Sequence, residues 1–294
     1  MLLSTPEGDP PPAPSRRAIA ASLFTLGYAA AIGSANAQAI TTPTDGLIIE
    51  EPRLRGAGGY ALPAYMARPE GRARHGAILV VNEIFGIHAY IKDVCHRLAR
   101  EGYVALAPDY FDRAGDPSTL ADFAAIRPIV EAATYEQVMG DTGRALAWLR
   151  RQHFVARARI GITGFCWGGS VVWMAAARFR AVKAGVAWYG RLSPPVAGGF
   201  GAEPGRPWPV DRAAALRAPV LGLYAERDRG TSLESVAAMR AALAAAGDRS
   251  GAEIVVMPGV EHGFHADYRP SYNEAAARAG WARMLAWFRA HGVF

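Results

Sequence analysis

Short apolar runs alternate with longer stretches of helical spacing along most of the chain. The short runs predict strands at residues 47–51, 60–67, 77–81, 104–107, 160–163, 182–189, 219–224 and 253–257. The longer stretches predict helices at residues 88–100, 118–131, 135–151, 171–178 and 232–246, and a closing helix with Trp281, Met284, Leu285 and Phe288 on its apolar side. Most predicted strands are apolar on both faces, which is typical of a mostly parallel sheet flanked by helices on both faces. The pattern therefore predicts one α/β domain over residues 38–294.

The stretch around residue 166 joins a predicted strand to a predicted helix through a glycine-rich turn. It reads GFCWGG over residues 164–169 and follows the apolar run at 160–163. This context is that of a nucleophile elbow, with Cys166 in the nucleophile position. The positive end of the following helix would favour the thiolate form of the sulfur. A structural cysteine buried in a glycine-rich bend is the alternative interpretation.

Three other reactive residues, Glu83, Asp228 and His262, fall just after predicted strands. Because the carboxyl ends of parallel strands share one edge of a sheet, we expect these side chains to meet Cys166 there. The chain order of nucleophile, acid and histidine is that of the α/β-hydrolases. We therefore predict a triad in which the Cys166 sulfur attacks a carbonyl, His262 moves the proton and Asp228 orients the imidazole.

Other parts of this site are predicted from their neighbours in sequence. The backbone N–H groups of Trp167 and Ile84 are expected to form the oxyanion hole. The stretch 192–209 is rich in proline and glycine and predicts a long loop at the rim of the site. Glu226 is a rival to Asp228 as the acid of the triad.

No metal or cofactor is predicted. His262 and His265 are three residues apart, but metal ligation at that spacing requires a helix, and Gly259 and Gly263 favour a loop instead. The stretch 56–61 superficially fits a dinucleotide-binding fingerprint. A strand pattern follows it, however, where the fingerprint requires a helix.

Composition and charge narrow the class of partner. The chain has 294 residues, of which 51% are hydrophobic and 20% charged, enough apolar material for one large core. Its formal net charge of +6 comes almost wholly from arginine, since Lys92 and Lys183 are the only lysines. The arginines are scattered among acidic residues, which argues against a nucleic-acid-binding surface. We expect a small-molecule substrate, and a monomer or small homo-oligomer.

Residues 1–37 have the pattern of a signal peptide. The basic pair Arg16-Arg17 precedes a mildly apolar run at residues 18–32 and a small-residue site that ends at Ala37. Paired arginines after a long polar start predict the twin-arginine route, cleavage after Ala37, and a periplasmic or secreted protein. The apolar run is too short and too rich in alanine and glycine for a convincing membrane span. A retained N-terminal anchor is the alternative.

An exported protein would meet an oxidising compartment, in which cysteines tend to pair. Cys95 and Cys166 are the only cysteines of the chain. Cys95 lies on the apolar face of a predicted helix and is expected to fill the core. A bridge between the two would block the nucleophile, so we predict that both are free thiols.

The chain resembles the dienelactone hydrolases from about residue 60 to residue 294. The motifs that carry the resemblance are NEIFG at 82–86, GYVALAPD at 102–109, GFCWGG at 164–169 and HGFH at 262–265. The resemblance implies an α/β-hydrolase fold and a cofactor-free, carboxymethylenebutenolidase-like enzyme that opens an unsaturated lactone with Cys166, Asp228 and His262. It also implies that Glu83 holds the resting cysteine and helps to convert it to thiolate when substrate binds.

Substrate recognition in that family uses two arginines that bind the carboxylate of the lactone. Arg113 matches one of them. The other falls four residues beyond the catalytic His262, where this chain has Ala266, with Arg269 nearby. The departure implies that a substrate carboxylate loses one of its two bidentate partners. Three aromatic residues are also expected to contact the substrate, namely Phe85, Tyr189 and Phe264.

The sequence thus predicts a cysteine-dependent hydrolase of a lactone or small carboxylic ester. Two alternatives stay open, which are hydrolysis of an unrelated ester or thioester, and a non-catalytic protein that binds a small molecule on the same fold. Rapid, histidine-dependent alkylation of Cys166 would argue against the non-catalytic alternative.

Overall fold

The computed structural model describes residues 39–55, 59–195, 199–247 and 250–294. The predicted signal peptide at residues 1–37 lies outside the described residues, as do residues 56–58 of the stretch that superficially fits a dinucleotide-binding fingerprint.

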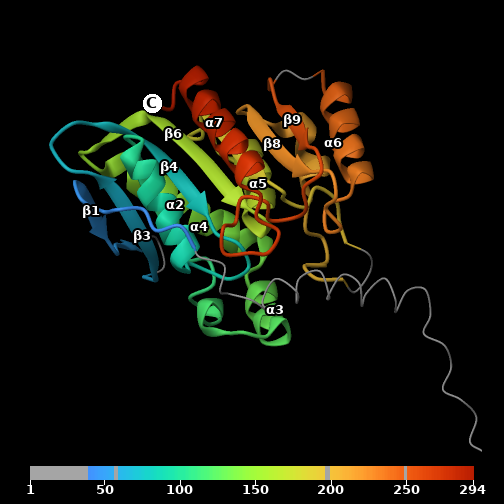
Figure 1. The fold of residues 1–294 in the computed structure, drawn as a ribbon, viewed down its shortest axis with the longest axis horizontal. Coiled ribbons are helices and arrows are strands. Elements are labelled where there is room, and N and C mark those ends of the chain that lie inside the picture. Colours follow the sequence, from blue (N-terminus) through green and yellow to red (C-terminus); the bar gives the residue numbers. More distant parts are fainter. Residues whose placement is uncertain (1–38, 56–58, 196–198, 248–249) are drawn as a thin grey trace, which may run out of the picture.

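A central sheet organises the described part of the chain (Figure 1). Its order is β1 (Leu47–Glu50), β3 (Ala61–Pro69), β5 (Val104–Pro108), β4 (His75–Val81), β6 (Val155–Phe165), β7 (Ala184–Trp188), β8 (Val220–Ala225) and β9 (Glu253–Met257). The pairings from β5 to β9 are parallel, whereas β1 and β3 are antiparallel to their neighbours. The prediction of a mostly parallel sheet is therefore confirmed.

Helices cover both faces of this sheet, as predicted. One face carries α2 (Ala89–Arg100) and α7 (Glu274–Ala290), and the other carries α3 (Phe123–Ala132), α4 (Tyr135–Arg151), α5 (Trp167–Arg178) and α6 (Leu233–Ala245). Successive side chains of β4 pack alternately against the helices of the two faces. Ile78 and Val80 pack beneath α2 and α7, and Leu79 and Val81 pack on the opposite side. A strand that is apolar on both faces thus supplies two cores at once.

The strands predicted at residues 47–51 and 60–67 pair with each other. β3 pairs with β1 in an antiparallel register that joins Leu47 to Pro69. It also pairs with the short strand β2 (Arg53–Arg55), which was not predicted. This antiparallel corner closes the edge of the sheet that lies farthest from β9.

The prediction of a single helix at residues 118–131 is wrong at its start. The structure has a short 3-10 helix, η1 (Pro117–Thr119), and then α3 after a break. Each piece has its own cap, because Asp116 accepts from the Ser118 N–H at 2.9 Å and Asp122 accepts from the Ala124 N–H at 3.1 Å. Two N-capping aspartates six residues apart favour two helix starts over one continuous helix.

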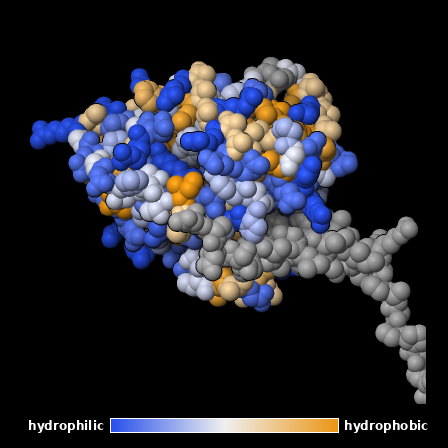
Figure 2. Space-filling view, viewed as in Figure 1, coloured by the Kyte–Doolittle hydropathy of each residue, from blue (hydrophilic) through white to orange (hydrophobic). Residues whose placement is uncertain are grey.

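A long loop was predicted at residues 192–209, and the described residues of that stretch, 192–195 and 199–208, contain neither helix nor strand. The 3-10 helix η2 (Pro209–Ala215) follows. On the face seen in Figure 2, hydrophilic and hydrophobic side chains are interspersed. Among the described residues, none of the helices has both the length and the apolar character that crossing a membrane requires.

Candidate active site

Cys166 lies at the junction of β6 and α5 with a backbone conformation that few residues other than glycine adopt. Its φ is 55° and its ψ is −116°. Such strain costs about 1 to 3 kcal/mol and persists only where the surrounding structure imposes it. The side chain is 2% exposed, and Cys166 is the N-cap of α5, which starts earlier than the predicted 171–178. The positive end of the helix dipole is therefore next to the thiol.

Gly168 allows the start of α5 to pack directly against the end of β4. A Cβ atom at Gly168 would lie 2.5 Å from the carbonyl oxygen of Val81 and 2.6 Å from that of Asn82. Any larger residue would push the two elements apart. The close approach brings the segment after β4, which holds Glu83 and Ile84, beside the elbow.

Asp228 and His262 meet across the sheet edge as the sequence predicts. Nδ1 of His262 donates to Oδ2 of Asp228 at 2.7 Å. The other carboxylate oxygen accepts from the N–H groups of Gly230 at 2.7 Å and Thr231 at 2.9 Å. The Asp228 side chain is fully buried, so these bonds fix its orientation. Nε2 of His262 is consequently the ring nitrogen that is left to exchange a proton with a reacting group.

The rival acid, Glu226, lies elsewhere. It is exposed, and its Oε2 accepts from the N–H of Gly259 at 2.7 Å. Glu226 therefore braces the turn after β9, and the structure brings Asp228 rather than Glu226 to His262.

His262 carries a strongly shifted pKa. Burial alone would lower this pKa, but the negative charge of Asp228 and the interaction with Cys166 outweigh the burial and raise the pKa to about 10. Imidazolium is therefore the favoured form at neutral pH. A protonated histidine beside a cysteine stabilises the thiolate, which is the nucleophilic form.

A pocket of about 410 Å³, its open mouth included, lies over this constellation. Six of the side chains that line it are Cys166, His262, Trp167, Tyr189, Arg191 and Arg206. Tyr189, predicted to contact substrate, packs edge-on against the His262 ring with centroids 5.0 Å apart. Its φ of 40° makes it another strained residue other than glycine in the pocket wall.

Glu83 is fully buried in a second cluster. The Tyr268 hydroxyl donates to its Oε2 at 2.6 Å, Arg269 Nη2 lies 3.5 Å from its Oε1, and His88 Nε2 lies 3.6 Å from its Oε2. Burial alone would raise the pKa of Glu83, but the charge of Arg269, with His88 and Tyr268, lowers it to about 2. Glu83 is therefore a carboxylate, and Arg269 also interacts electrostatically with Cys166.

The two residues predicted to form the oxyanion hole lie at the elbow and beside it, although Trp167 was expected in the turn before the helix rather than in the helix. Trp167 is the first residue of α5 and lines the pocket, and Ile84 is buried in the segment that the Gly168 contact holds against the elbow. Their N–H groups as an oxyanion hole stay a prediction.

Two of the predicted substrate contacts do not line this pocket. Phe264 is fully buried against Tyr189, with centroids 5.3 Å apart. Phe85 packs edge-on against Tyr268 at 6.4 Å, in the Glu83 cluster.

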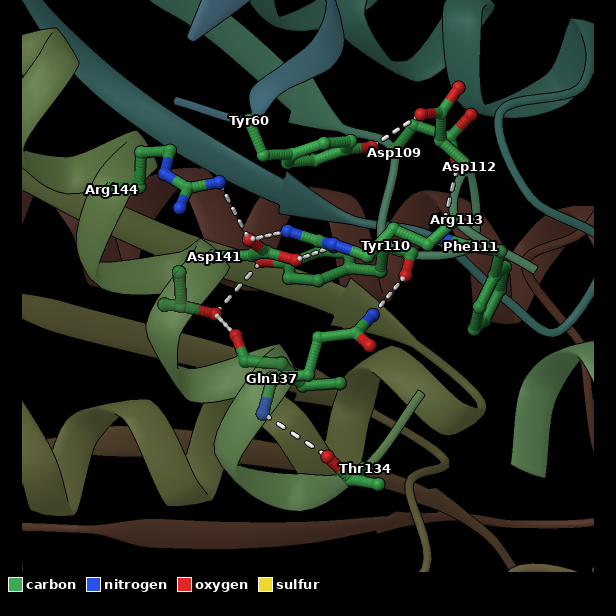
Figure 3. A network of polar contacts seen from close by, with 12 residues as sticks. Tyr60, Asp109, Tyr110, Phe111, Asp112, Arg113, Thr134, Gln137, Asp141 and Arg144 are labelled. Atoms are coloured by element: carbon green, nitrogen blue, oxygen red, sulfur yellow. Dashed lines mark hydrogen bonds and ion pairs between the residues drawn. The ribbon is translucent and has the colours of Figure 1, made fainter. Parts of the chain in front are cut away.

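Arg113 is also absent from the pocket lining, and its charge is already paired. Its Nη1 and Nη2 atoms donate to Asp141 at 2.6 and 2.9 Å, and its guanidinium lies 3.9 Å from the centroid of the Tyr60 ring (Figure 3). Arg144 adds a further bond to Asp141 at 3.2 Å, and the Tyr60 hydroxyl donates to Asp112. The arginine that matches the family motif therefore lies in a closed ion-pair network, outside the pocket lining.

Arg191 and Arg206 line the pocket but were not predicted as site residues. The one sequence signal near them was the predicted rim loop at residues 192–209. Neither arginine belongs to a recognisable motif, so only the folded structure brings both to the pocket of Cys166.

The rival metal site does not form. His265 is buried behind the pocket, with its Nδ1 2.7 Å from the Tyr90 hydroxyl, and burial lowers its pKa to about 3. Within the described ranges, no group of three or more histidine, cysteine, aspartate or glutamate side chains could hold a metal ion. Cys95 and Cys166 are both buried, and no disulfide joins them.

Comparison with known proteins gives one consistent family. The model of the Dienelactone hydrolase family matches residues 62–292. A Methylorubrum extorquens protein named "Putative carboxymethylenebutenolidase" is 46% identical over 281 residues, which are 95% of this chain and 94% of that protein. An Escherichia coli K12 protein of the same name is 41% identical over 268 residues, which are 90% and 96% of the two chains.

A solved structure agrees with these sequence matches. The crystal structure named "Putative Dienelactone Hydrolase" from Klebsiella pneumoniae superposes with a TM-score of 0.76 at 42% identity. The match covers 83% of this chain and 98% of that one.

Proposed function

Because the chain belongs to the dienelactone hydrolase family of ester and lactone hydrolases, we propose that it hydrolyses a lactone or small carboxylic ester with Cys166 as nucleophile. The observation that carries the proposal is the 2.7 Å bond between His262 Nδ1 and Asp228, made by a histidine that shares one pocket with Cys166. A non-catalytic binding protein has no need of an acid that aligns a histidine beside a strained cysteine.

The reaction follows from these positions. The Cys166 thiolate attacks the carbonyl carbon, and the C–O bond to the leaving oxygen breaks as that oxygen takes the proton from Nε2 of His262. In a lactone the leaving oxygen stays on the same molecule, so the ring opens. Neutral His262 then takes a proton from water, whose oxygen attacks the thioester and releases the carboxylic acid product and the thiolate. Asp228 keeps the imidazole in one tautomer throughout.

The negative oxygen of each tetrahedral intermediate needs donors close by. We assign this role to the N–H groups of Trp167 and Ile84, which are supported by the packing of the elbow against the end of β4.

Glu83 acts on the sulfur through charge in this proposal. Its carboxylate offsets Arg269, whose positive charge reaches Cys166. The support for a part of Glu83 in activating the nucleophile is this electrostatic link, because any change in the Glu83–Arg269 pair when substrate binds would change the charge that acts on the sulfur.

The test is hydrolysis of dienelactone and of small aryl esters by the purified protein and by Cys166→Ala and Cys166→Ser variants. We expect the alanine variant to lose turnover while its near-ultraviolet circular dichroism stays that of the parent. Cys95→Ala is the matched control, since that thiol is buried in the core away from the pocket. Turnover by the alanine variant at the parent rate would remove Cys166 from the mechanism.

We also propose export by the twin-arginine route, with cleavage after Ala37. The Arg16-Arg17 pair and the apolar run at 18–32 support it. Sequencing the N-terminus of the protein from a periplasmic fraction tests the proposal, and a full-length N-terminus there would argue for a retained anchor.

A further inference from the structure

The Tyr268 hydroxyl lies between the two buried charges of the Glu83 cluster. It donates to Oε2 of Glu83 at 2.6 Å and accepts from Nε of Arg269 at 3.1 Å. Tyr268 and Arg269 come from the segment after β9, which also carries His262, whereas Glu83 comes from the segment after β4. One hydroxyl thus links the segment that holds Glu83 to the segment that holds His262.

The direct contact between Glu83 and Arg269 is long for a buried ion pair. Nη2 of Arg269 lies 3.5 Å from Oε1 of Glu83, and within the described ranges neither atom has a hydrogen-bond partner. An arginine and a carboxylate frequently form two parallel N–H···O bonds of about 2.7 to 2.9 Å. Here the Tyr268 hydroxyl takes the place of a carboxylate oxygen at Nε, and the contact through Nη2 stays too long for a good bond.

The pair formed by Arg113 and Asp141 shows the closed arrangement in the same protein. Nη1 and Nη2 of Arg113 donate to the two oxygens of Asp141 at 2.6 and 2.9 Å (Figure 3). The carboxylate side chains of both pairs are almost fully buried, so burial does not explain the difference. The inserted hydroxyl of Tyr268 does explain it.

Packing fixes the position of this hydroxyl. Three rings pack against the Tyr268 ring, with centroids at 5.0, 5.4 and 6.4 Å, namely those of His88, Tyr90 and Phe85. Asp267, the residue before Tyr268, forms an ion pair with Arg97 of α2. Tyr268→Phe would therefore keep the packing of the ring and remove only the hydroxyl.

The Arg269 guanidinium lies next to the catalytic histidine. A Cβ atom at Gly263, the residue after His262, would lie 2.8 Å from Nη1 of Arg269. The guanidinium therefore packs against the backbone beside His262, and its charge acts on Cys166. A positive charge near a thiol favours the thiolate. How strongly it does so depends on how completely Glu83 offsets that charge.

We propose that the Tyr268 hydroxyl is a positioning group that holds the buried ion pair of Glu83 and Arg269 open. The separation of this pair sets how much positive charge acts on the Cys166 sulfur. The proposal rests on the proposed function, in which Cys166 is the nucleophile. Without the hydroxyl, the carboxylate and the guanidinium close into a bidentate pair. Glu83 then offsets more of the positive charge, and the thiolate is less favoured.

The test is the pH dependence of Cys166 alkylation by iodoacetamide, measured in a Cys95→Ala background so that Cys166 is the only thiol. Because the thiolate is the form that reacts, the rate reports the apparent pKa of the thiol beside His262. We expect Tyr268→Phe to raise this pKa by about one pH unit, so that alkylation below the pKa of the parent slows by about tenfold. The value of kcat/KM for a small aryl ester should fall in parallel.

Tyr272→Phe is the matched control. It removes a hydroxyl from the same segment and keeps the bond that the Tyr272 backbone N–H donates to the backbone oxygen of Arg269 at 3.1 Å. Its alkylation profile should be that of the parent.

A background without the two charges separates positioning from packing. In Glu83→Gln combined with Arg269→Met, the hydroxyl has no ion pair to hold open. Adding Tyr268→Phe to that background should leave the alkylation profile of Cys166 unchanged. A further shift in the profile there would mean that the hydroxyl acts by another route, and would overturn the proposal.

The outcomes separate this inference from the proposed function. If the parent hydrolyses esters or lactones while Tyr268→Phe keeps the alkylation profile of the parent, or shifts it to lower pH, the positioning role is overturned and the hydrolase stands. If the parent hydrolyses none of these substrates, the hydrolase is contradicted, and the alkylation profiles still decide whether Tyr268 controls the charge at Cys166.

Discussion

Asp228 and Glu83 are both fully buried carboxylates close to Cys166, yet their surroundings differ. Asp228 pairs with His262, whose side chain is 17% exposed and lines the pocket. Glu83 pairs with Arg269, which is 3% exposed, and with the Tyr268 hydroxyl. The first carboxylate acts on a group that can reach substrate. The second neutralises a charge inside the protein.

The difference shows that burial alone does not identify a catalytic acid. A buried carboxylate needs a partner in either setting, because leaving the charge unpaired costs several kcal/mol. What distinguishes the two is whether the partner can pass a proton to the pocket. Histidine can, near neutral pH, whereas arginine cannot be deprotonated in a protein.

The largest effect is expected from Asp228→Asn. The amide no longer stabilises imidazolium and can bind the wrong tautomer of His262, so kcat should fall by roughly 10³-fold or more. Steady-state kinetics would measure the fall, and thermal unfolding would show a folded protein. Glu226→Gln is the matched control at the exposed acid two residues away. Activity close to that of the parent would make Asp228 a structural residue.

The next largest effect is expected on the pKa of His262. The pKa of about 10 lies above the ordinary value of 6.5, so the stability that the charged form contributes is present in full below pH 6.5 and is lost as pH rises through about 10. We expect the histidine signal of His262, followed by NMR, to titrate near pH 10 in the parent and several pH units lower in Asp228→Asn. Titration near 6.5 in both proteins would mean that Asp228 does not act on the imidazole.

Glu83→Gln should instead affect stability. The fall in the pKa of Glu83 from 4.5 to about 2 corresponds to about 3 kcal/mol of folding free energy at neutral pH. The variant also leaves the charge of Arg269 buried without its partner. The contribution is present above pH 4.5 and is lost as pH falls through about 2. Urea denaturation at pH 7 and at pH 3 should therefore show a smaller difference between variant and parent at the lower pH.

A double variant sharpens this prediction. Glu83→Gln combined with Arg269→Met removes both charges, so it should recover part of the stability that Glu83→Gln loses. Additive losses would show that the two residues are not coupled, and Glu83 would then need another explanation.

The smallest effect is expected at Arg113. Arg113→Met removes two hydrogen bonds to Asp141, but Arg144 still pairs with that carboxylate at 3.2 Å. We expect a loss of about 1 to 2 kcal/mol in the free energy of unfolding, measured by urea denaturation, and an unchanged ratio of kcat/KM between an aryl ester that bears a carboxylate and a neutral aryl ester. A changed ratio without a loss of stability would assign Arg113 to substrate binding.

The sequence alone determined most of the fold. Apolar runs of strand length and stretches of helical spacing predicted the parallel sheet and its two helical layers, because the strand and helix periods depend only on residues that are close together in sequence. The elbow was readable for the same reason, since strand, Cys166 and helix are contiguous. The chain order of Cys166, Asp228 and His262 predicted which residues would gather, because parallel strands end at one edge.

The tertiary structure alone decided how those residues are used. It brought Asp228 to His262 and left Glu226 at the surface. It paired Arg113 with Asp141. It placed Arg191 and Arg206 in the lining of the pocket. It also joined Glu83 to Tyr268 across 185 positions of sequence. The charge state of a buried group depends on the side chains that fold against it, and distances of that kind are set by packing rather than by any local pattern.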